Sequence, residues 1–158
     1  MLVNNLMTAN PKTCQPNDNL DAAARIMWEA DCGAVPIVDN DGRVIGLVTD
    51  RDICMAAYTQ GQPLRSIPLT VAMAKNVLTC RADDDVGAAE SIMREARVRR
   101  LPVVDHDDRL VGMLSLNDLA REAVHEGVRR DAPQPDDLAR TLAAICEPRQ
   151  PIMAVHSA

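Results

Sequence analysis

Two stretches of this chain, residues 20–30 and 86–96, share one pattern of apolar positions. In each, apolar side chains recur at intervals of three, four and seven residues: Ala23, Ile26, Met27 and Ala30, then Ala89, Ile92, Met93 and Ala96. This spacing places them on one face of an α-helix. Polar residues at 17–19 and 83–85 come just before, where their side chains can cap a first helical turn. The pattern predicts two amphipathic helices, each with one buried face.

Two short apolar runs follow each predicted helix and indicate a β-hairpin. The first pair covers residues 35–38 and 44–48 around the turn 39–42, and the second covers 101–104 and 110–114 around 105–108. Short apolar runs separated by Asp, Asn or Gly are typical of paired strands.

An extended piece is expected before each unit, at residues 12–14 and 78–80. A last helix is expected to open at residues 49–52 and at 115–118. The element order β-α-β-β-α, read twice, predicts an α+β fold in which helices cover small sheets.

The two units are copies of one motif, displaced by 66 residues. When residues 7–56 are set over 73–122 without a gap, 18 of the 50 positions are identical. Each copy is too short to bury an adequate core alone, so the two should pack about a pseudo-twofold axis. We therefore divide the chain into a first repeat at 3–60, a second repeat at 69–126 and a tail at 127–158.

The tail is expected to hold a linker and one short helix. Residues 129–137 are polar with two prolines, and residues 138–146 place apolar side chains on one helical face: Leu138, Leu142, Ile145 and Cys146. Such a short helix cannot stand alone. We expect it to dock on its own body or on a second subunit.

Composition excludes several classes of function. The 158 residues carry a formal net charge of −6 and only 1% aromatic residues, which does not suit a binder of nucleic acid. No apolar run approaches the roughly 18 residues of a membrane span, and the first residues do not resemble a signal peptide. We expect a cytoplasmic protein. The five cysteines are scattered without a C-x-x-C pair, so they are read as reduced core thiols.

The motif Thr49-x-x-Asp52, repeated as Ser115-x-x-Asp118, has two interpretations. It can be a capping box that ties off its own helix. The same geometry presents a helix N-terminus to a phosphate, with the hydroxyl as a donor and the carboxylate as an acceptor for a ribose diol. Arg51 adds a cation to the first copy, where the second has Asn117, so the two sites are not equivalent.

A cluster of cations precedes the strand of the second copy. Arg97, Arg99 and Arg100 stand where the first copy has Asp31, Gly33 and Ala34. Arginine makes bidentate contacts to phosphate oxygens, although salt bridges to nearby carboxylates are an equal alternative. One copy supplies charge where the other supplies room. Neither a Walker A motif nor a Ser-His-Asp constellation is present, so we do not expect an enzyme.

The residues carrying these patterns resemble a known family. Residues 33–39 (GAVPIVD) and 42–53 (GRVIGLVTDRDI), with their copies at 99–105 (RRLPVVD) and 109–119 (RLVGMLSLNDL), resemble the core signature of the cystathionine-β-synthase-type (CBS) domain. The resemblance extends from about residue 3 to residue 124. The tail helix is similar to that of small stand-alone bacterial CBS-pair proteins, some of them induced by stress or hypoxia.

This resemblance implies a tandem pair, or Bateman module, whose two sheets face each other. Clefts between the copies would bind AMP, ADP, ATP, S-adenosylmethionine or NAD as regulatory ligands, with no obligatory cofactor. It also implies a disc-like homodimer formed through the apolar final helices. The chain would then perform no catalysis and would signal to a protein target in trans.

The resemblance assigns roles to individual residues. Asp52 and Asp118 match ribose-binding aspartates, and Thr49 and Ser115 match hydroxyls near the phosphate. Arg99 and Arg100 match basic residues that reach phosphates in energy-sensing kinase subunits. Six positions match the surroundings of the adenine: Thr13, Ala34, Val35, Thr79, Arg100 and Leu101.

A second hypothesis is a redox- or metal-responsive stress protein that uses its cysteines. Cys14 and Cys80 are equivalent under the repeat. In this hypothesis they approach each other or a shared ligand. Thiol counting and metal analysis separate it from a nucleotide-binding module.

Overall fold

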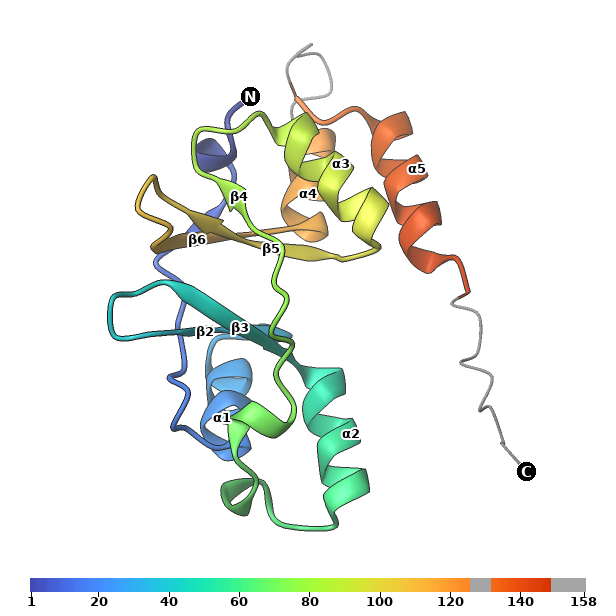
Figure 1. Ribbon diagram of the computed structural model, residues 1–158. Coiled ribbons are helices and arrows are strands. Elements are labelled where there is room, and N and C mark those ends of the chain that lie inside the picture. Colours follow the sequence, from blue (N-terminus) through green and yellow to red (C-terminus); the bar gives the residue numbers. More distant parts are fainter. Residues whose placement is uncertain (126–131, 149–158) are drawn as a thin grey trace, which may run out of the picture.

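The computed structural model of the chain describes residues 1–125 and 132–148. Two similar units stack with their strands facing each other across the middle of the molecule and their helices on the outside (Figure 1). The α+β fold and the pairing of two repeats, expected from the sequence, are confirmed. Within the described ranges, no helix is long and apolar enough to cross a membrane.

The first repeat forms a hairpin covered by two helices. Its elements are α1 (Leu20–Glu29), β2 (Ala34–Val38), β3 (Val44–Thr49) and α2 (Asp50–Gln60). The Asn19 side chain caps α1 by accepting the N–H of Ala22 at 3.1 Å, as the polar residues before the helix predicted.

The second repeat has the same order with one more strand. Its elements are β4 (Cys80–Arg81), α3 (Val86–Ala96), β5 (Arg100–Val104), β6 (Leu110–Ser115) and α4 (Leu116–His125). Both ends of α1 and α3, and the starts of α2 and α4, lie within one residue of their predicted positions. Each repeat has its own apolar core between helices and hairpin.

The extended piece expected at residues 12–14 does not form a strand. Only Cys14 pairs, in an isolated parallel bridge to Ile37, whereas its copy Cys80 starts β4 beside Val103. The backbone of Cys14 still donates to Pro36 O and accepts from Val38 N, both at 3.0 Å. The geometry of the repeat is therefore kept, over a shorter length.

The segment that leads into each repeat packs on the other repeat, which the sequence pattern did not indicate. Val3, in a 3-10 turn η1 (Val3–Asn5), is buried in the second core, and its N–H donates to Asp84 O at 2.9 Å. Its copy Leu69, in η3 (Leu69–Val71), is buried in the first core and donates to Asp18 O at 3.0 Å. We call residues 1–9 and 64–74 the exchanged segments.

The exchanged segments also extend the sheets. The first contains β1 (Thr8–Ala9), which pairs antiparallel with β6 and makes the strand order β1-β6-β5-β4. The second contains the 3-10 turn η2 (Leu64–Ser66) and a bridge from Ala74 to Leu47 of β3. Each hairpin therefore has a partner segment from outside its own repeat.

The tail helix α5 (Pro135–Cys146) docks on its own chain, against α3 and α4. Its buried face differs from the predicted one. Leu138 and Ile145 pack on the second core and Thr141 is fully buried, whereas Leu142 and Cys146 are exposed. The reason is a buried hydrogen bond, 2.8 Å long, from the Thr141 hydroxyl to Glu90 of α3, which rotates a polar residue inward. The predicted linker at 129–137 lies partly outside the described residues, and its last three residues are not linker but the first turn of α5, because Pro135 suits the first position of a helix.

Close packing of the exchanged segments requires glycine at one position in each sheet. A Cβ at Gly46 would lie 2.8 Å from Met73 Sδ, and a Cβ at the equivalent Gly112 would overlap Met7 Sδ. We expect Gly112→Ala to destabilise the protein by about 1–3 kcal/mol through overpacking. Urea unfolding measures the loss. Combining Gly112→Ala with Met7→Ala should cost less than the sum of the two single changes, and additive costs would contradict this packing.

Candidate functional site

Both Thr/Ser-x-x-Asp motifs form capping boxes in the structure. The Asp52 Oδ2 atom accepts from the backbone N–H of Thr49 at 2.9 Å and from its hydroxyl at 2.6 Å. The Asp118 Oδ2 atom accepts from Ser115 in the same way, at 2.8 and 2.6 Å. The capping interpretation is therefore confirmed for both motifs. Because each box uses Oδ2, the second oxygen of each carboxylate is the one that remains for other partners.

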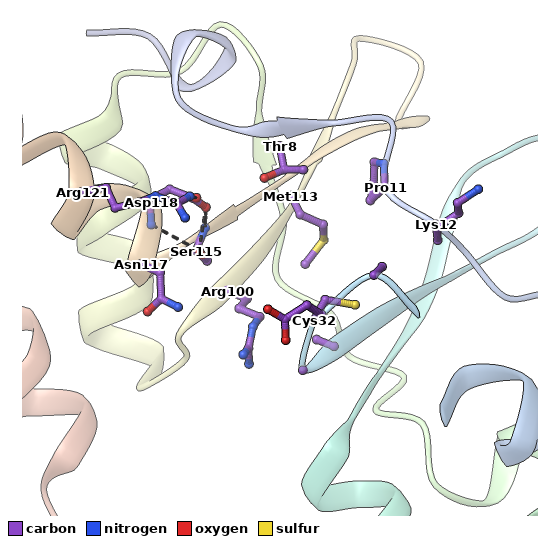
Figure 2. Close-up of a pocket in the computed structure, with 14 residues that line it drawn as sticks. Thr8, Pro11, Lys12, Cys32, Arg100, Met113, Ser115, Asn117, Asp118 and Arg121 are labelled. Carbon is purple, nitrogen blue, oxygen red and sulfur yellow. Dashed lines mark hydrogen bonds and ion pairs between the residues drawn. The ribbon is translucent and has the colours of Figure 1, made fainter. Parts of the chain in front are cut away.

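A cleft opens between the repeats at the start of α4, with a volume of about 280 Å³. We call it the Ser115 cleft (Figure 2). The second repeat contributes Arg100 and the first turn of α4. The first repeat contributes residues 30–34, and the N-terminal segment contributes Thr8, Pro11 and Lys12. A helix N-terminus from one repeat thus faces the start of a strand from the other.

A second cleft occupies the equivalent place across the pseudo-twofold axis, with a volume of about 170 Å³. We call it the Thr49 cleft. It is lined by the first turn of α2 and by residues 98–100 of the second repeat. Asp52 does not line it and borders a separate groove with Met55 and Thr59. The two predicted carboxylates are therefore not equivalent, since Asp118 does line its cleft.

Both clefts contain more cations than acids, although the chain as a whole has a net charge of −6. Three of the residues that line the Thr49 cleft are cations and one is an acid: Arg51, Arg99, Arg100 and Asp50. In the Ser115 cleft three cations face two acids: Lys12, Arg100, Arg121, Asp31 and Asp118. Together with the helix N-termini, these charges favour an anionic group.

The three arginines of the cluster differ in role: one forms a salt bridge, and two line a cleft where they can contact a phosphate. Arg97 forms an ion pair with Glu147, just beyond α5. Within residues 1–125 and 132–148, Arg99 and Arg100 have no carboxylate within 4.0 Å, and both line a cleft. Arg121 pairs with Asp118 through the oxygen that the capping box leaves open.

Other predicted site residues lie in different places. The side chains of Val35 and Leu101 are fully buried in the two cores, so only their main chains can face a ligand. Neither Thr13 nor Thr79 lines either cleft. Ala34 and Asn117 do line the Ser115 cleft, and Thr49 and Arg51 line the other.

Sequence reasoning missed several polar residues of the Ser115 cleft, among them Thr8, Lys12, Cys32 and Arg121. Thr8 belongs to an exchanged segment and reaches the cleft through its pairing with Met113. Gly33 was recognised as a position that supplies room, and a Cβ there would lie only 2.9 Å from Arg100 Nη2. The small residue at position 33, where the second repeat has Arg99, was therefore the signal in the sequence for a cleft at this turn.

The repeat-equivalent cysteines are buried in different cores. Burial, with a smaller effect of Asp18, raises the pKa of Cys14 to about 11. Burial and the charge of Asp84 raise the pKa of Cys80 to about 12. Both thiols are therefore protonated near neutral pH, which disfavours metal binding or thiolate chemistry. In the ranges that the structure describes, no three His, Cys, Asp or Glu residues gather as a metal site.

We expect the native protein to show two classes of thiol. Exposed Cys54 and Cys146 should react with iodoacetamide at pH 8, while Cys14 and Cys80 should react only after unfolding, because they are buried and protonated. Peptide mass spectrometry after timed alkylation measures each residue. Rapid labelling of Cys80 in the folded protein would contradict this description.

Comparison with known proteins places both repeats in one family. The family model for the CBS domain matches residues 3–58 and 65–125. A homoserine O-acetyltransferase of Methanohalobium evestigatum is 34% identical over 119 residues, 75% of this chain, but the match spans only 23% of that protein. The CBS domain-containing protein YhcV of Bacillus subtilis is 33% identical over 118 residues, covering 75% of this chain and 82% of YhcV.

Three solved structures share the fold over nearly their whole length. The CBS domain pair of protein MJ0100, in complex with 5-methylthioadenosine and S-adenosyl-L-methionine, has a TM-score of 0.72 and 27% identity, covering 82% of this chain and 98% of that one. CBSX2 in complex with AMP has a TM-score of 0.69 and 26% identity, covering 80% and 98%. Hypoxic response protein I, with two coordinated zinc ions, has a TM-score of 0.69 and 30% identity, covering 77% and 98%.

Proposed function

This chain belongs to the CBS-domain family, and we propose that it is a cytoplasmic regulatory module that binds adenosine-containing ligands in the Ser115 and Thr49 clefts. Two of its structural neighbours were solved with such ligands, namely AMP in one and 5-methylthioadenosine with S-adenosyl-L-methionine in the other. The module itself performs no chemistry, and ligand binding alters what a protein target in trans recognises.

The observation that carries this proposal is the composition of the two clefts. Each combines the capped N-terminus of a helix from one repeat with the start of a strand from the other. A ligand bound there touches both repeats and so stabilises one arrangement of the two over others. Such differential affinity is what a regulatory ligand requires.

The ribose of the ligand is assigned to Asp118 in the Ser115 cleft. Its Oδ2 atom is held by the capping box, and its Oδ1 atom contacts Arg121. The Arg121 side chain is 69% exposed, whereas the Asp118 side chain is only 6% exposed, so the pair has one solvated and one buried partner. A ribose hydroxyl that replaces Arg121 at Oδ1 must therefore satisfy the buried carboxylate with its own hydrogen bond. The cations and the helix N-terminus then face the phosphate or another polar group at the 5′ position.

We also propose that the module forms a homodimer through its outer helices. α2 exposes Met55 and Tyr58, with 47% and 82% of their surface accessible, and α4 exposes Val124 at 82%. Large apolar side chains on an outer face are a common feature of protein interfaces. Light scattering at several protein concentrations measures the assembly, and a monomer throughout would contradict this part of the proposal.

Calorimetric titration with AMP, ATP, S-adenosylmethionine, 5-methylthioadenosine and NAD tests the ligand class. We expect at least one of them to bind, and Asp118→Asn to weaken binding in the Ser115 cleft about tenfold to a hundredfold. That range corresponds to a lost hydrogen bond to a charged group of about 1.5–3 kcal/mol. Asparagine keeps an oxygen for the capping box, so the fold should survive.

Asp84→Asn is the matched control. Asp84 Oδ2 accepts a backbone N–H at 2.7 Å near the start of a helix, as Asp118 does, but it lies outside both clefts. The Asp84→Asn variant should bind each ligand with the affinity of the unaltered protein. Absence of binding by all five compounds, or equal affinity for Asp118→Asn, would reject the proposed function.

A further inference from the structure

One guanidinium group serves both clefts. Arg100, the first residue of β5, lines the Ser115 cleft and also the Thr49 cleft. Its copy under the repeat is Ala34, which lines both clefts too but carries no charge. Positions 34 and 100 are therefore equivalent under the repeat, but only position 100 carries a cation.

The Arg100 side chain lies over the backbone of Gly33. A Cβ at position 33 would be 2.9 Å from Arg100 Nη2 and 3.1 Å from Asp50 Oδ2. Figure 2 shows that the side chains of Arg100 and Asn117 extend into the same open space between the repeats. Among the residues the structure describes, no carboxylate lies within the 4.0 Å of an ion pair with Arg100. The guanidinium therefore lies near the Asp50 carboxylate but outside ion-pair distance of it, and it borders both clefts.

The two clefts depend on Arg100 to different degrees. Without it, the Thr49 cleft still has Arg51 and Arg99 against one acid, Asp50. The Ser115 cleft is left with two cations against two acids, because Lys12 and Arg121 face Asp31 and Asp118. An anionic ligand should therefore enter the Thr49 cleft first, while the Ser115 cleft needs Arg100 to attract a second one.

We propose that Arg100 couples the two clefts by competition, so that an anionic ligand in the Thr49 cleft weakens the binding of an anionic ligand in the Ser115 cleft. A planar guanidinium makes its bidentate contact to one phosphate at a time. Once the phosphate in the Thr49 cleft draws Arg100 to itself, the Ser115 cleft loses its excess of positive charge. Coupling of this kind commonly changes affinity about 5- to 150-fold. Ligands without a phosphate escape the competition. This inference rests on the proposed function.

Cys32 offers a readout for one cleft, because it lines the Ser115 cleft and not the other. The probe is the AMP concentration that half-protects Cys32 from alkylation by N-ethylmaleimide, followed by peptide mass spectrometry on the full chain. The test variant is Arg51→Gln/Arg99→Gln, which removes the two cations that only the Thr49 cleft has. Because the Thr49 cleft stays empty in this variant, the AMP concentration that half-protects Cys32 should fall by roughly tenfold or more relative to the unaltered protein.

Arg100→Gln separates competition from direct repulsion between two phosphates. In that background, Arg51→Gln/Arg99→Gln should no longer change the AMP concentration for half-protection, because there is no shared group to withdraw. Two close phosphates that merely repel each other would keep the difference, or enlarge it, when Arg100 is absent. Persistence of the difference therefore overturns the proposal, as does its absence in the protein that retains Arg100.

5-Methylthioadenosine is the uncharged control ligand and also the check on folding. It should protect Cys32 in every variant at a concentration that does not depend on Arg51 and Arg99. If none of the five compounds gives heat in calorimetry, the proposed function fails together with the coupling. If another of the five binds but AMP does not protect Cys32, only the coupling is rejected. If AMP protects Cys32 equally well in the unaltered chain and in Arg51→Gln/Arg99→Gln, only the coupling is rejected.

Discussion

The exchange of leading segments between the repeats is the constraint on which the rest of the structure depends. Val3, which leads into the first repeat, is completely buried in the core of the second. Leu69, which leads into the second repeat, is completely buried in the core of the first. Burying a side chain of this size contributes about 1.5–3 kcal/mol, and the strand bridges add directional hydrogen bonds. Because each half is completed by a segment connected to the other, the two sheets are held face to face. That arrangement brings a helix start from each repeat to the boundary between them.

The capping boxes explain how one short motif can serve both folding and binding. A helix must satisfy its first N–H groups, and a hydroxyl with an acid three residues later does so locally. At the boundary between the repeats, the same residues also form part of a cleft wall. Ser115 and Asp118 thus contribute to stability whether or not a ligand is present. Only the opposite repeat turns this helix start into a binding surface.

A symmetric frame here carries an asymmetric distribution of charge. Gly33 and Ala34 in the first repeat correspond to Arg99 and Arg100 in the second, so both cations come from one side. The small residues leave the space into which Arg100 extends. Two clefts of related shape therefore differ in volume, in charge and in their dependence on one guanidinium. For a module that responds to ligands, unequal sites give more than one occupied state, and each of those states can be recognised differently by a partner.

Local pattern predicted most of the fold. The spacing of Ala23, Ile26 and Met27 was sufficient to place α1, and the apolar runs with Asp-rich turns predicted both hairpins, because these signals are properties of a single element. The repeat itself indicated that two like halves pack together. The residue types at positions 49, 99, 100 and 118 were enough to identify residues that line a cleft.

The tertiary structure decided which segments meet. The sequence did not predict the exchange of leaders, the presence of Thr8 and Lys12 in the Ser115 cleft, or the rotation of α5 that buries Thr141 against Glu90. Hydrophobic periodicity reports which face of an element is buried, and it carries no information on which distant segment covers that face. The position of Asp52 outside its cleft, and of Arg100 in both clefts, likewise follows from packing between repeats that are 66 residues apart in the chain.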